Sequence, residues 1–324
     1  MNVTEAAAPT GAAEPRPAPR CLACGASGAA RWASAEDVEY YTSADSFTFY
    51  RCPRCASLFI DPVPSARLSE IYPPSYYSYG DPGKSLVHAV KSFLDRRFFR
   101  RILADVPGSE LRALDVGGGA GWELSAVRDT DPRIRHTTVV DLDPNAAELA
   151  AANGHAYFCG RIEDYESSEA FDLVLLLNVI EHVEDPVRVL DKVRSLLSPS
   201  GVALLKTPNY DALDARVFRH QSWAGYHCPR HWVLFTKESF TQAAERAGLS
   251  VRRAEYTQGA PFWAASTLAW LGRRRLVRVG RERPVFYHPL FKPLAALFAA
   301  FDFARRPFAK TSQMFFVLAR GSAG

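Results

Sequence analysis

The feature that most constrains the fold is a glycine-dense turn between an apolar run and a helix-like segment. The apolar run ends at Asp115, and glycines follow at Gly117, Gly119 and Gly121. Glycine is required where the backbone takes a positive φ or approaches a ligand closely. This order predicts a strand, a tight loop and a helix N-terminus, where an α/β sheet holds a ligand beside backbone N–H groups.

The glycine spacing excludes two familiar nucleotide-binding motifs. A dinucleotide fingerprint counted from Gly117 requires glycine at position 122, where this chain has Trp122. A phosphate-binding loop requires Gly-Lys-Ser or Gly-Lys-Thr, which this stretch lacks. The glycines alone are also compatible with a simple tight turn. Whether the turn binds a ligand therefore has to be judged from the residues downstream.

Two later segments end strand-like runs in a similar way. Asp141 closes a β-rich run twenty positions after Gly121, where a carboxylate can accept both hydroxyls of a ribose. Asn178 follows the apolar run 172–177 and leads into the segment Glu181-His182-Val183. In this order, the three motifs resemble those of the class I S-adenosylmethionine-dependent methyltransferases, in particular the small-molecule branch with a Glu-His-Val segment. The resemblance covers roughly 110–256 and 312–320.

The resemblance implies a Rossmann-like, doubly wound sheet of seven strands whose final strand runs antiparallel. It also implies S-adenosylmethionine as the cofactor. Asp115 and the backbone of Gly117, Gly119 and Gly121 would hold its methionine end, Asp141 its ribose, Leu142 and the Ile162 backbone its adenine, and Asn178 would lie near its sulfonium. The family usually has an acid where this chain has Arg161.

The pattern downstream of residue 111 supports that fold without the resemblance. Strand-like and helix-like segments alternate there, which is typical of a parallel, doubly wound sheet. Asp143-Pro144, Asp185-Pro186 and Thr236 predict helix starts, because Asp and Thr cap helices and proline suits the first turn. Segments 251–256 and 313–319 predict the last two strands.

Four cysteines near the N-terminus predict a metal site. They form two Cys-x-x-Cys pairs, Cys21 with Cys24 and Cys52 with Cys55, and two such pairs can present four thiolates to one structural zinc ion. Two disulfides or a redox motif are the alternatives. Disulfides are rare in the reducing cytoplasm, where we expect this protein, and the presence of two matched pairs argues against a redox motif. The other two cysteines, Cys159 and Cys228, are expected to be buried small residues.

Composition divides the chain into four regions. Residues 1–20 are rich in alanine and proline and predict a disordered tail, without the apolar centre of a signal peptide. Residues 21–60 predict a small zinc-ribbon-like module, and 61–105 a tyrosine-rich linker followed by a helix between 84 and 104. Residues 106–324 predict the methyltransferase domain. We therefore expect a cytoplasmic protein.

Candidates for a catalytic base are histidines. His182 belongs to the Glu-His-Val segment, where its alternative role is a hydrogen bond at a helix start. His227 and His231 lie in an aromatic loop, 220–232, that follows the fifth strand, over the ends of the strands where open α/β sheets bind ligands. Pro229 argues against a helix that would place both on one metal ion. Ubiquinone-type methyltransferases have a Glu-x-x-Glu-His magnesium site, but Asn178 replaces the first glutamate here.

Residues 261–310 form an insertion before the last strand. They contain ten Lys or Arg against two acids, together with the apolar patches 261–271 and 289–303. Such a segment can cover the substrate site, lie on an anionic membrane or make a homodimer contact. Neither patch reaches the length of a membrane span.

The sequence thus predicts an S-adenosylmethionine-dependent methyltransferase that O-methylates a small molecule, a sugar or a secondary metabolite, with a histidine assisting an in-line transfer. A zinc-finger-bearing ribosomal RNA methyltransferase is one alternative, although the net charge of only +4 makes a nucleic-acid partner the weaker choice. A non-catalytic binding protein on the same fold is the other.

Overall fold

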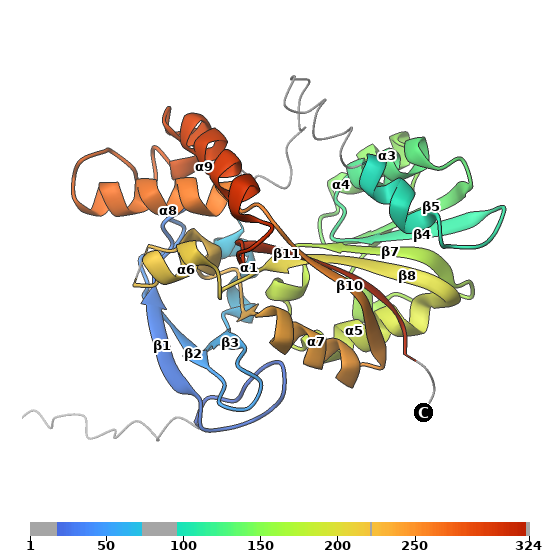
Figure 1. Ribbon diagram of the computed structural model, residues 1–324, viewed down its shortest axis with the longest axis horizontal. Coiled ribbons are helices and arrows are strands. Elements are labelled where there is room, and N and C mark those ends of the chain that lie inside the picture. Colours follow the sequence, from blue (N-terminus) through green and yellow to red (C-terminus); the bar gives the residue numbers. More distant parts are fainter. Residues whose placement is uncertain (1–17, 73–95, 221, 322–324) are drawn as a thin grey trace, which may run out of the picture.

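The fold consists of a large, mostly parallel sheet and a smaller antiparallel sheet beside it (Figure 1). The computed structural model describes residues 18–72, 96–220 and 222–321. In order across the large sheet, its strands are β10 (Leu249–Thr257), β11 (Gln313–Arg320), β8 (Leu197–Pro208), β7 (Phe171–Leu177), β4 (Leu111–Val116), β5 (Ile134–Asp141) and β6 (Ala156–Cys159). β11 is antiparallel to both of its neighbours, whereas the strands from β8 to β6 run parallel. The predicted seven-stranded Rossmann-like sheet is confirmed.

Helices cover both faces of this sheet. They are α3 (Trp122–Thr130) and α4 (Ala146–Ala152) on one face, and α5 (Pro186–Leu196) and α7 (Lys237–Arg246) on the other. Successive residues of β7 enter different cores: Leu173 and Leu175 pack toward α3, whereas Val174 and Leu176 pack toward α5. The central strands are therefore apolar throughout, as strands buried on both faces must be.

The helix starts largely follow the predicted caps. The Asp185 carboxylate accepts a hydrogen bond from the Arg188 N–H at 2.9 Å at the start of α5, and Thr236 caps α7. α4 begins at Ala146, later than the pair Asp143-Pro144 predicts. The Asp143 carboxylate does accept from the Asn145 N–H, as a cap would, but residues 144–145 form a turn in which the Ala146 N–H donates to the Asp143 carbonyl.

The smaller sheet joins the cysteine-bearing segment, residues 21–60, to the later part of the chain that forms the large sheet. Its strands, in order, are β1 (Ala30–Ala35), β2 (Phe47–Arg51), β3 (Leu58–Ile60) and β9 (Val233–Leu234). β9 follows the histidine loop, about 170 residues after β3, and Leu58 pairs with Leu234. The predicted module 21–60 is thus completed by a strand from beyond its own boundary.

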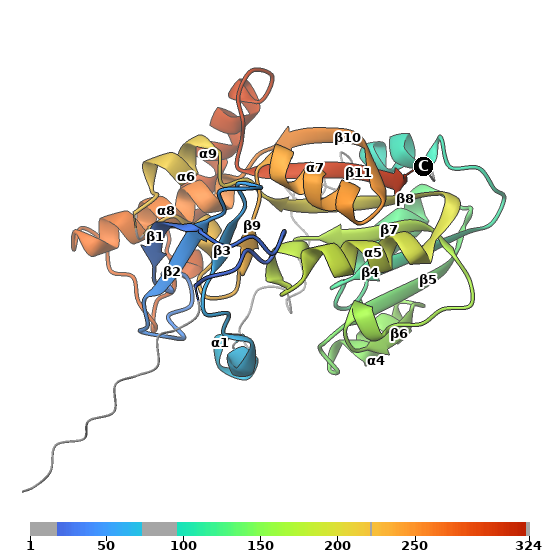
Figure 2. The ribbon, with the colours of Figure 1, turned by 90° about the horizontal axis from the view of Figure 1, so that it is seen from below.

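An α-helical hairpin stands between β10 and β11. It comprises α8 (Ala260–Arg273) and α9 (Phe291–Arg305), joined by residues 274–290, which include the 3-10 turn Val285–Tyr287. Both views place α8 and the smaller sheet at the same end of the large sheet (Figure 1, Figure 2). The remaining short helices are α1 (Leu68–Ile71) and α6 (Leu213–Val217). Among the described residues, no helix is both long enough and apolar enough to span a bilayer.

Some predictions lie partly or wholly outside the described residues. These include the tail up to residue 17 and the tyrosine-rich stretch from residue 73 onward. Of the helix predicted between 84 and 104, residues 96–103 are described and are helical. The expectation that Cys159 is buried is wrong: it is exposed, because β6 is the edge strand of the large sheet, whereas Cys228 is buried.

Candidate active site

The glycine turn adopts the positive-φ backbone that its sequence predicts. Gly117, Gly119 and Gly121 have φ values of 72°, 52° and 78°. A Cβ atom on Gly117 would lie 2.6 Å from Cγ2 of Val179, and one on Gly121 would lie 2.3 Å from Cδ2 of His155. Residues with a side chain are therefore excluded twice, by backbone conformation and by space. The turn presents bare backbone at the carboxyl end of β4.

The Asp141 carboxylate links the glycine turn to the residues that follow β5. Its Oδ2 accepts a hydrogen bond from the Gly119 N–H at 2.8 Å, and its Oδ1 accepts from the Asp143 N–H at 2.9 Å. Leu142 follows with 59% of its surface exposed, and Trp122 at the start of α3 is 45% exposed. Large apolar side chains beside bare backbone are a common arrangement in small-molecule sites.

The charges around the turn favour a cationic ligand. Asp115 is buried at the end of β4, and burial together with the nearby Glu123 and Asp141 raises its pKa well above the usual value. A positive group at this place would relieve the repulsion among the carboxylates.

Beside this group, Asn178 has a φ of 59°, and its buried Oδ1 has no hydrogen-bond partner within the described part of the chain. A ligand with an ammonium and a sulfonium, such as S-adenosylmethionine, fits these hydrogen-bond acceptors and negative charges. Ile162 begins a 3-10 turn, Ile162–Asp164, after β6, and its side chain is buried in the core. Direct cofactor contact by each of these residues stays a prediction.

The structure brings the three predicted histidines together. The ring centroids of His182 and His231 are 4.7 Å apart, and those of His227 and His231 are 4.8 Å apart. His182 belongs to the 3-10 turn Ile180–His182 after β7, whereas the other two come from the loop after β8. We refer to these three residues as the histidine cluster.

The histidine cluster adjoins the glycine turn through Val179. The Val179 side chain occupies the space beside Gly117, and its carbonyl accepts a hydrogen bond from the His182 N–H at 2.9 Å. Only three residues separate Asn178 from His182. A ligand held on the glycine turn therefore lies close to the cluster.

Each ring of the cluster is held through its Nδ1 atom. Nδ1 of His231 is 2.9 Å from the Gly225 carbonyl oxygen, and Nδ1 of His182 is 3.0 Å from the Arg230 carbonyl oxygen and 2.9 Å from the Tyr72 hydroxyl. A carbonyl can only accept, so both rings donate from Nδ1 and have their lone pair on Nε2. Nδ1 of His227 donates to a carboxylate oxygen of Glu39.

The protonation states within the cluster differ. Burial, reinforced by His227, lowers the pKa of His182 to about 3, and burial lowers the pKa of His231 well below its usual value. These two rings are neutral near pH 7. Glu181 is fully buried, and burial raises the pKa of its carboxyl group to about 8 although Thr207 donates to it.

Glu181, His182 and His231 also form a group that can hold a cation. Their potential ligand atoms all lie within 4.8 Å of one another, and Oε1 of Glu181 has no hydrogen-bond partner among the described residues. The donors, one carboxylate oxygen and two imidazole nitrogens, suit zinc or another first-row divalent ion. From the sequence, a metal ion was considered for His227 with His231 and for a ubiquinone-type magnesium site at Glu181-His182, and both were disfavoured. The group of Glu181, His182 and His231 was not predicted.

Two acids from the cysteine-bearing segment complete the surroundings of the cluster. Glu39 and Asp37, in the connection between β1 and β2, are each only 3% exposed. Asp37 pairs with the guanidinium of Arg230 at 3.0 Å, and Arg230 is itself fully buried. Asp37 also accepts from the backbone N–H groups of Tyr40 and Thr42, which fixes the segment carrying Glu39. No local pattern marks these acids, because their partners lie about 190 residues away.

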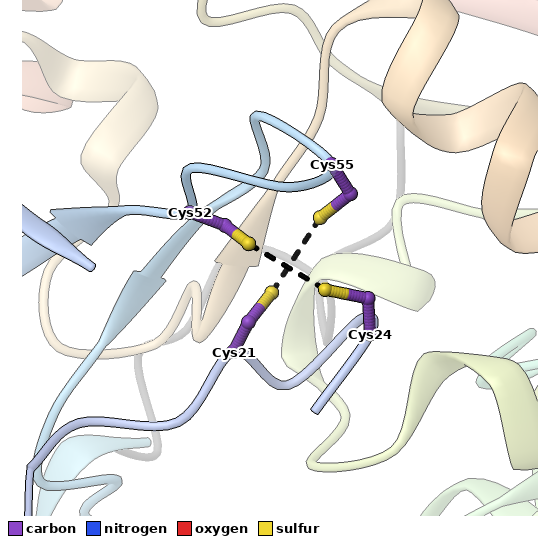
Figure 3. A group of neighbouring side chains, drawn as sticks. All are labelled: Cys21, Cys24, Cys52 and Cys55. Carbon is purple, nitrogen blue, oxygen red and sulfur yellow. Dashed lines mark hydrogen bonds between the residues drawn. The ribbon is translucent and has the colours of Figure 1, made fainter. Parts of the chain in front are cut away.

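The four cysteines converge as the two pairs predict. Figure 3 shows their sulfur atoms pointing toward one centre. The Sγ atoms of Cys21 and Cys55 are 3.6 Å apart, those of Cys24 and Cys52 are 3.5 Å apart, and all four lie within 4.8 Å of one another. Zinc–sulfur bonds of about 2.3 Å in a tetrahedron place sulfurs about 3.8 Å apart, so the group fits one zinc ion.

The sheet order and the glycine turn define a class I S-adenosylmethionine-dependent methyltransferase, and comparison with known proteins agrees. A family model described as "Methyltransferase domain" matches residues 87–254, just over half of the chain. The chain belongs to this methyltransferase family.

Curated relatives match a shorter stretch. The ubiquinone biosynthesis O-methyltransferase of Rhodopseudomonas palustris (strain BisB5) is 36% identical over 110 residues, which cover 31% of this chain and 41% of that protein. That of Bradyrhizobium sp. (strain ORS 278) is 37% identical with the same coverage. A separate comparison with solved structures matches the N-methyltransferase NodS of Bradyrhizobium japonicum WM9 in complex with S-adenosyl-L-homocysteine. The match covers 78% of this chain and 95% of the NodS chain, at 14% sequence identity and a TM-score of 0.44. The chain spans about two fifths of the length of the two ubiquinone biosynthesis O-methyltransferases.

Proposed function

We propose that this methyltransferase transfers its methyl group to a hydroxyl of a small molecule, a sugar-containing or other secondary metabolite, and that His227 takes the hydroxyl proton. The observation that carries the proposal is the hydrogen bond between His227 and the buried Glu39, within a histidine cluster that adjoins the glycine turn. The names of the curated relatives, which are O-methyltransferases, support oxygen as the acceptor atom.

The cofactor supplies an electrophilic methyl group when it is bound, and its transfer depends mainly on in-line positioning. In this proposal Asp115, the backbone of Gly117 to Gly121, and Asn178 hold its charged methionine end. Asp141 binds the ribose, while Leu142 and the backbone of Ile162 contact the adenine. The chain's further contribution is to orient the acceptor and to remove its proton.

His227 is the best base of the three histidines. Its Nδ1 proton points to Glu39, so the lone pair of the neutral ring lies on Nε2. As the acceptor oxygen bonded to the methyl carbon, the sulfur–carbon bond of the cofactor would break and S-adenosylhomocysteine would leave. The hydroxyl O–H bond would break with it, and Nε2 would take the proton, giving an imidazolium that the Glu39 carboxylate would stabilise. His182 and His231 lack a carboxylate at Nδ1 and resist protonation, so their role is to orient the acceptor oxygen.

His227 and His231 are each about 5% exposed. An acceptor therefore has to displace neighbouring side chains to reach the two rings. The experiment must distinguish catalysis by His227 from a purely structural role of this residue. The four cysteines, in the same proposal, bind one structural zinc ion with no position left open for water.

The test is a comparison of His227→Gln with His136→Gln, an exposed histidine on β5. Product formation is measured with labelled S-adenosylmethionine and a panel of phenolic, catecholic and sugar acceptors, and cofactor affinity with S-adenosylhomocysteine. We expect His227→Gln to lose about a hundredfold to ten-thousandfold in turnover with unchanged cofactor affinity.

The His136→Gln control should behave like the parent protein. Normal turnover in a folded His227→Gln variant would contradict the assignment of the base. Salt-sensitive binding of ribosomal RNA would favour the RNA methyltransferase instead.

A further inference from the structure

The outer surface of α9 is apolar although it faces solvent. Apart from Lys292 in its first turn, its exposed residues are apolar or small and form one helical stripe, Pro293, Ala296, Leu297, Ala300, Phe301 and Ala304, with Phe303 beside it. Leu297 is 62% exposed and Phe303 is 77% exposed. A helix at the surface of a soluble protein normally places charged side chains on its outer face. We call this stripe the outer face of α9.

The inner side of the hairpin shows that this exposure does not result from loose packing. The rings of Trp263 on α8 and Phe298 on α9 stack with centroids 4.9 Å apart. The buried Asp302 accepts a hydrogen bond from the Gly259 N–H at 2.8 Å, and Ser266 accepts one from the Ala224 N–H in the histidine loop. The hairpin is therefore a well-packed element that covers the loop carrying His227 and His231 and turns an apolar face outward.

Cationic side chains gather in the connection between α8 and α9. Arg275, Arg278, Arg281 and Arg283 are exposed, and none of them forms an ion pair with any carboxylate in the described part of the chain. Leu276, 67% exposed, lies in the same connection. Guanidinium groups are suited to phosphate oxygens, which they can bind with two parallel hydrogen bonds.

We propose that the α8–α9 hairpin docks this enzyme on the surface of an anionic lipid bilayer. The outer face of α9 would enter the boundary between headgroups and acyl chains, while the four arginines contact lipid phosphates. Charge complementarity selects this occupant over a second copy of the chain. In a twofold contact a copy would bring the same unpaired arginines, whereas a bilayer supplies the missing negative charge.

The contact is peripheral, because no described helix is long enough to cross the bilayer. It places the histidine loop, which the hairpin covers, on the membrane side of the molecule. The inference does not depend on which acceptor or which base the enzyme uses, so it can be tested without an activity assay.

The experiment is co-sedimentation of the full chain with vesicles of phosphatidylcholine alone and with vesicles containing phosphatidylglycerol. The charge variant Arg278→Gln/Arg281→Gln/Arg283→Gln is matched by Arg101→Gln/Arg135→Gln/Arg252→Gln, three exposed arginines outside the hairpin. The apolar variant Leu297→Asn/Phe303→Asn is matched by Leu149→Asn/Val217→Asn, where the side chains are 56% and 60% exposed. Thermal melting confirms that each variant folds.

We expect the parent protein to sediment with the anionic vesicles only. The charge variant should bind about a hundredfold more weakly, and less steeply with salt, while both controls should bind normally. The apolar variant should lose binding even at low salt. Absence of binding to anionic vesicles, or equal loss in hairpin and control variants, would overturn the proposal. A dimer that only Leu297→Asn/Phe303→Asn abolishes, without vesicle binding, would overturn it in favour of self-association.

Discussion

The glycine turn and the histidine cluster are neighbours, but they are built in opposite ways. The turn is made of backbone from one continuous stretch. Segments that follow it in sequence hold it in place: Asp141 accepts from the Gly119 N–H, the Val140 carbonyl accepts from the Gly117 N–H, and the Asn153 amide donates to the Ala120 carbonyl. The cluster is made of side chains from separate segments, with His182 after β7, His227 and His231 after β8, and Glu39 from between β1 and β2. One site is local in sequence, and the other exists only after the chain has folded.

In the proposed function the turn holds the cofactor and the cluster faces the acceptor, so the two halves of the reaction can vary independently. A backbone site that holds a common cofactor tolerates few changes, since a Cβ on Gly117 or Gly121 has no room. A side-chain site assembled from distant loops can be altered one residue at a time. The cysteine-bearing segment belongs to the second kind of site, because it supplies Glu39 and the Asp37 that pairs with Arg230.

The largest effect is expected when the cysteine group is broken. Cys52→Ser should reduce the zinc content from one ion per chain to near zero and unfold residues 21–60, because zinc binding contributes about 10–16 kcal/mol in small zinc modules. Metal analysis and hydrogen exchange measure both effects. Cys159→Ser, an exposed cysteine, is the control. A Cys52→Ser protein that stays folded and loaded with zinc would refute the assignment.

The buried pair of Asp37 and Arg230 comes next. Although burial opposes it, the Arg230 guanidinium holds the pKa of Asp37 below its usual value. Asp37→Leu removes the carboxylate that faces the buried guanidinium, so we expect a loss of about 3–5 kcal/mol in the free energy of unfolding by urea. The double variant Asp37→Leu/Arg230→Met should recover part of that loss. If Asp37→Leu alone cost under about 1 kcal/mol, the pair would not support the cluster.

Acid is expected to have a smaller effect for each pH unit. The pKa of His182 is lowered to about 3 in the folded protein, against about 6.5 in an unfolded chain. Between these values the unfolded chain binds a proton that the folded ring excludes. Stability therefore falls as the pH falls from about 6.5 toward 3, by at most about 1.4 kcal/mol per pH unit from this residue. His182→Gln should flatten that part of the stability profile, whereas the exposed His136→Gln should not. Equal slopes in all three proteins would contradict the burial of an uncharged ring.

The sequence predicted the fold and the glycine turn well, because both depend on local patterns. Strand and helix periodicity, the caps at Asp185 and Thr236, and the glycine spacing are each contained in a few neighbouring residues. The pairing of Leu58 with Leu234 and the bond between Glu39 and His227 could not be predicted in this way, since each joins residues more than 170 positions apart. The three histidines were identified as candidates, but their mutual contact and the approach of Glu181 became visible only in the structure.

The most direct test that the glycine turn binds the cofactor independently of the histidine cluster is a calorimetric titration. S-adenosylhomocysteine is titrated into the parent protein, Gly121→Ala and His227→Gln. We expect the parent and His227→Gln to bind with equal affinity, because the cluster does not form the glycine turn. Gly121→Ala should bind at least tenfold more weakly, since its Cβ meets His155 and its φ is positive, whereas Gly28→Ala, with a similar φ and open space, should bind normally. The account would be contradicted if the parent failed to bind at millimolar ligand, or if a folded His227→Gln lost affinity as Gly121→Ala does.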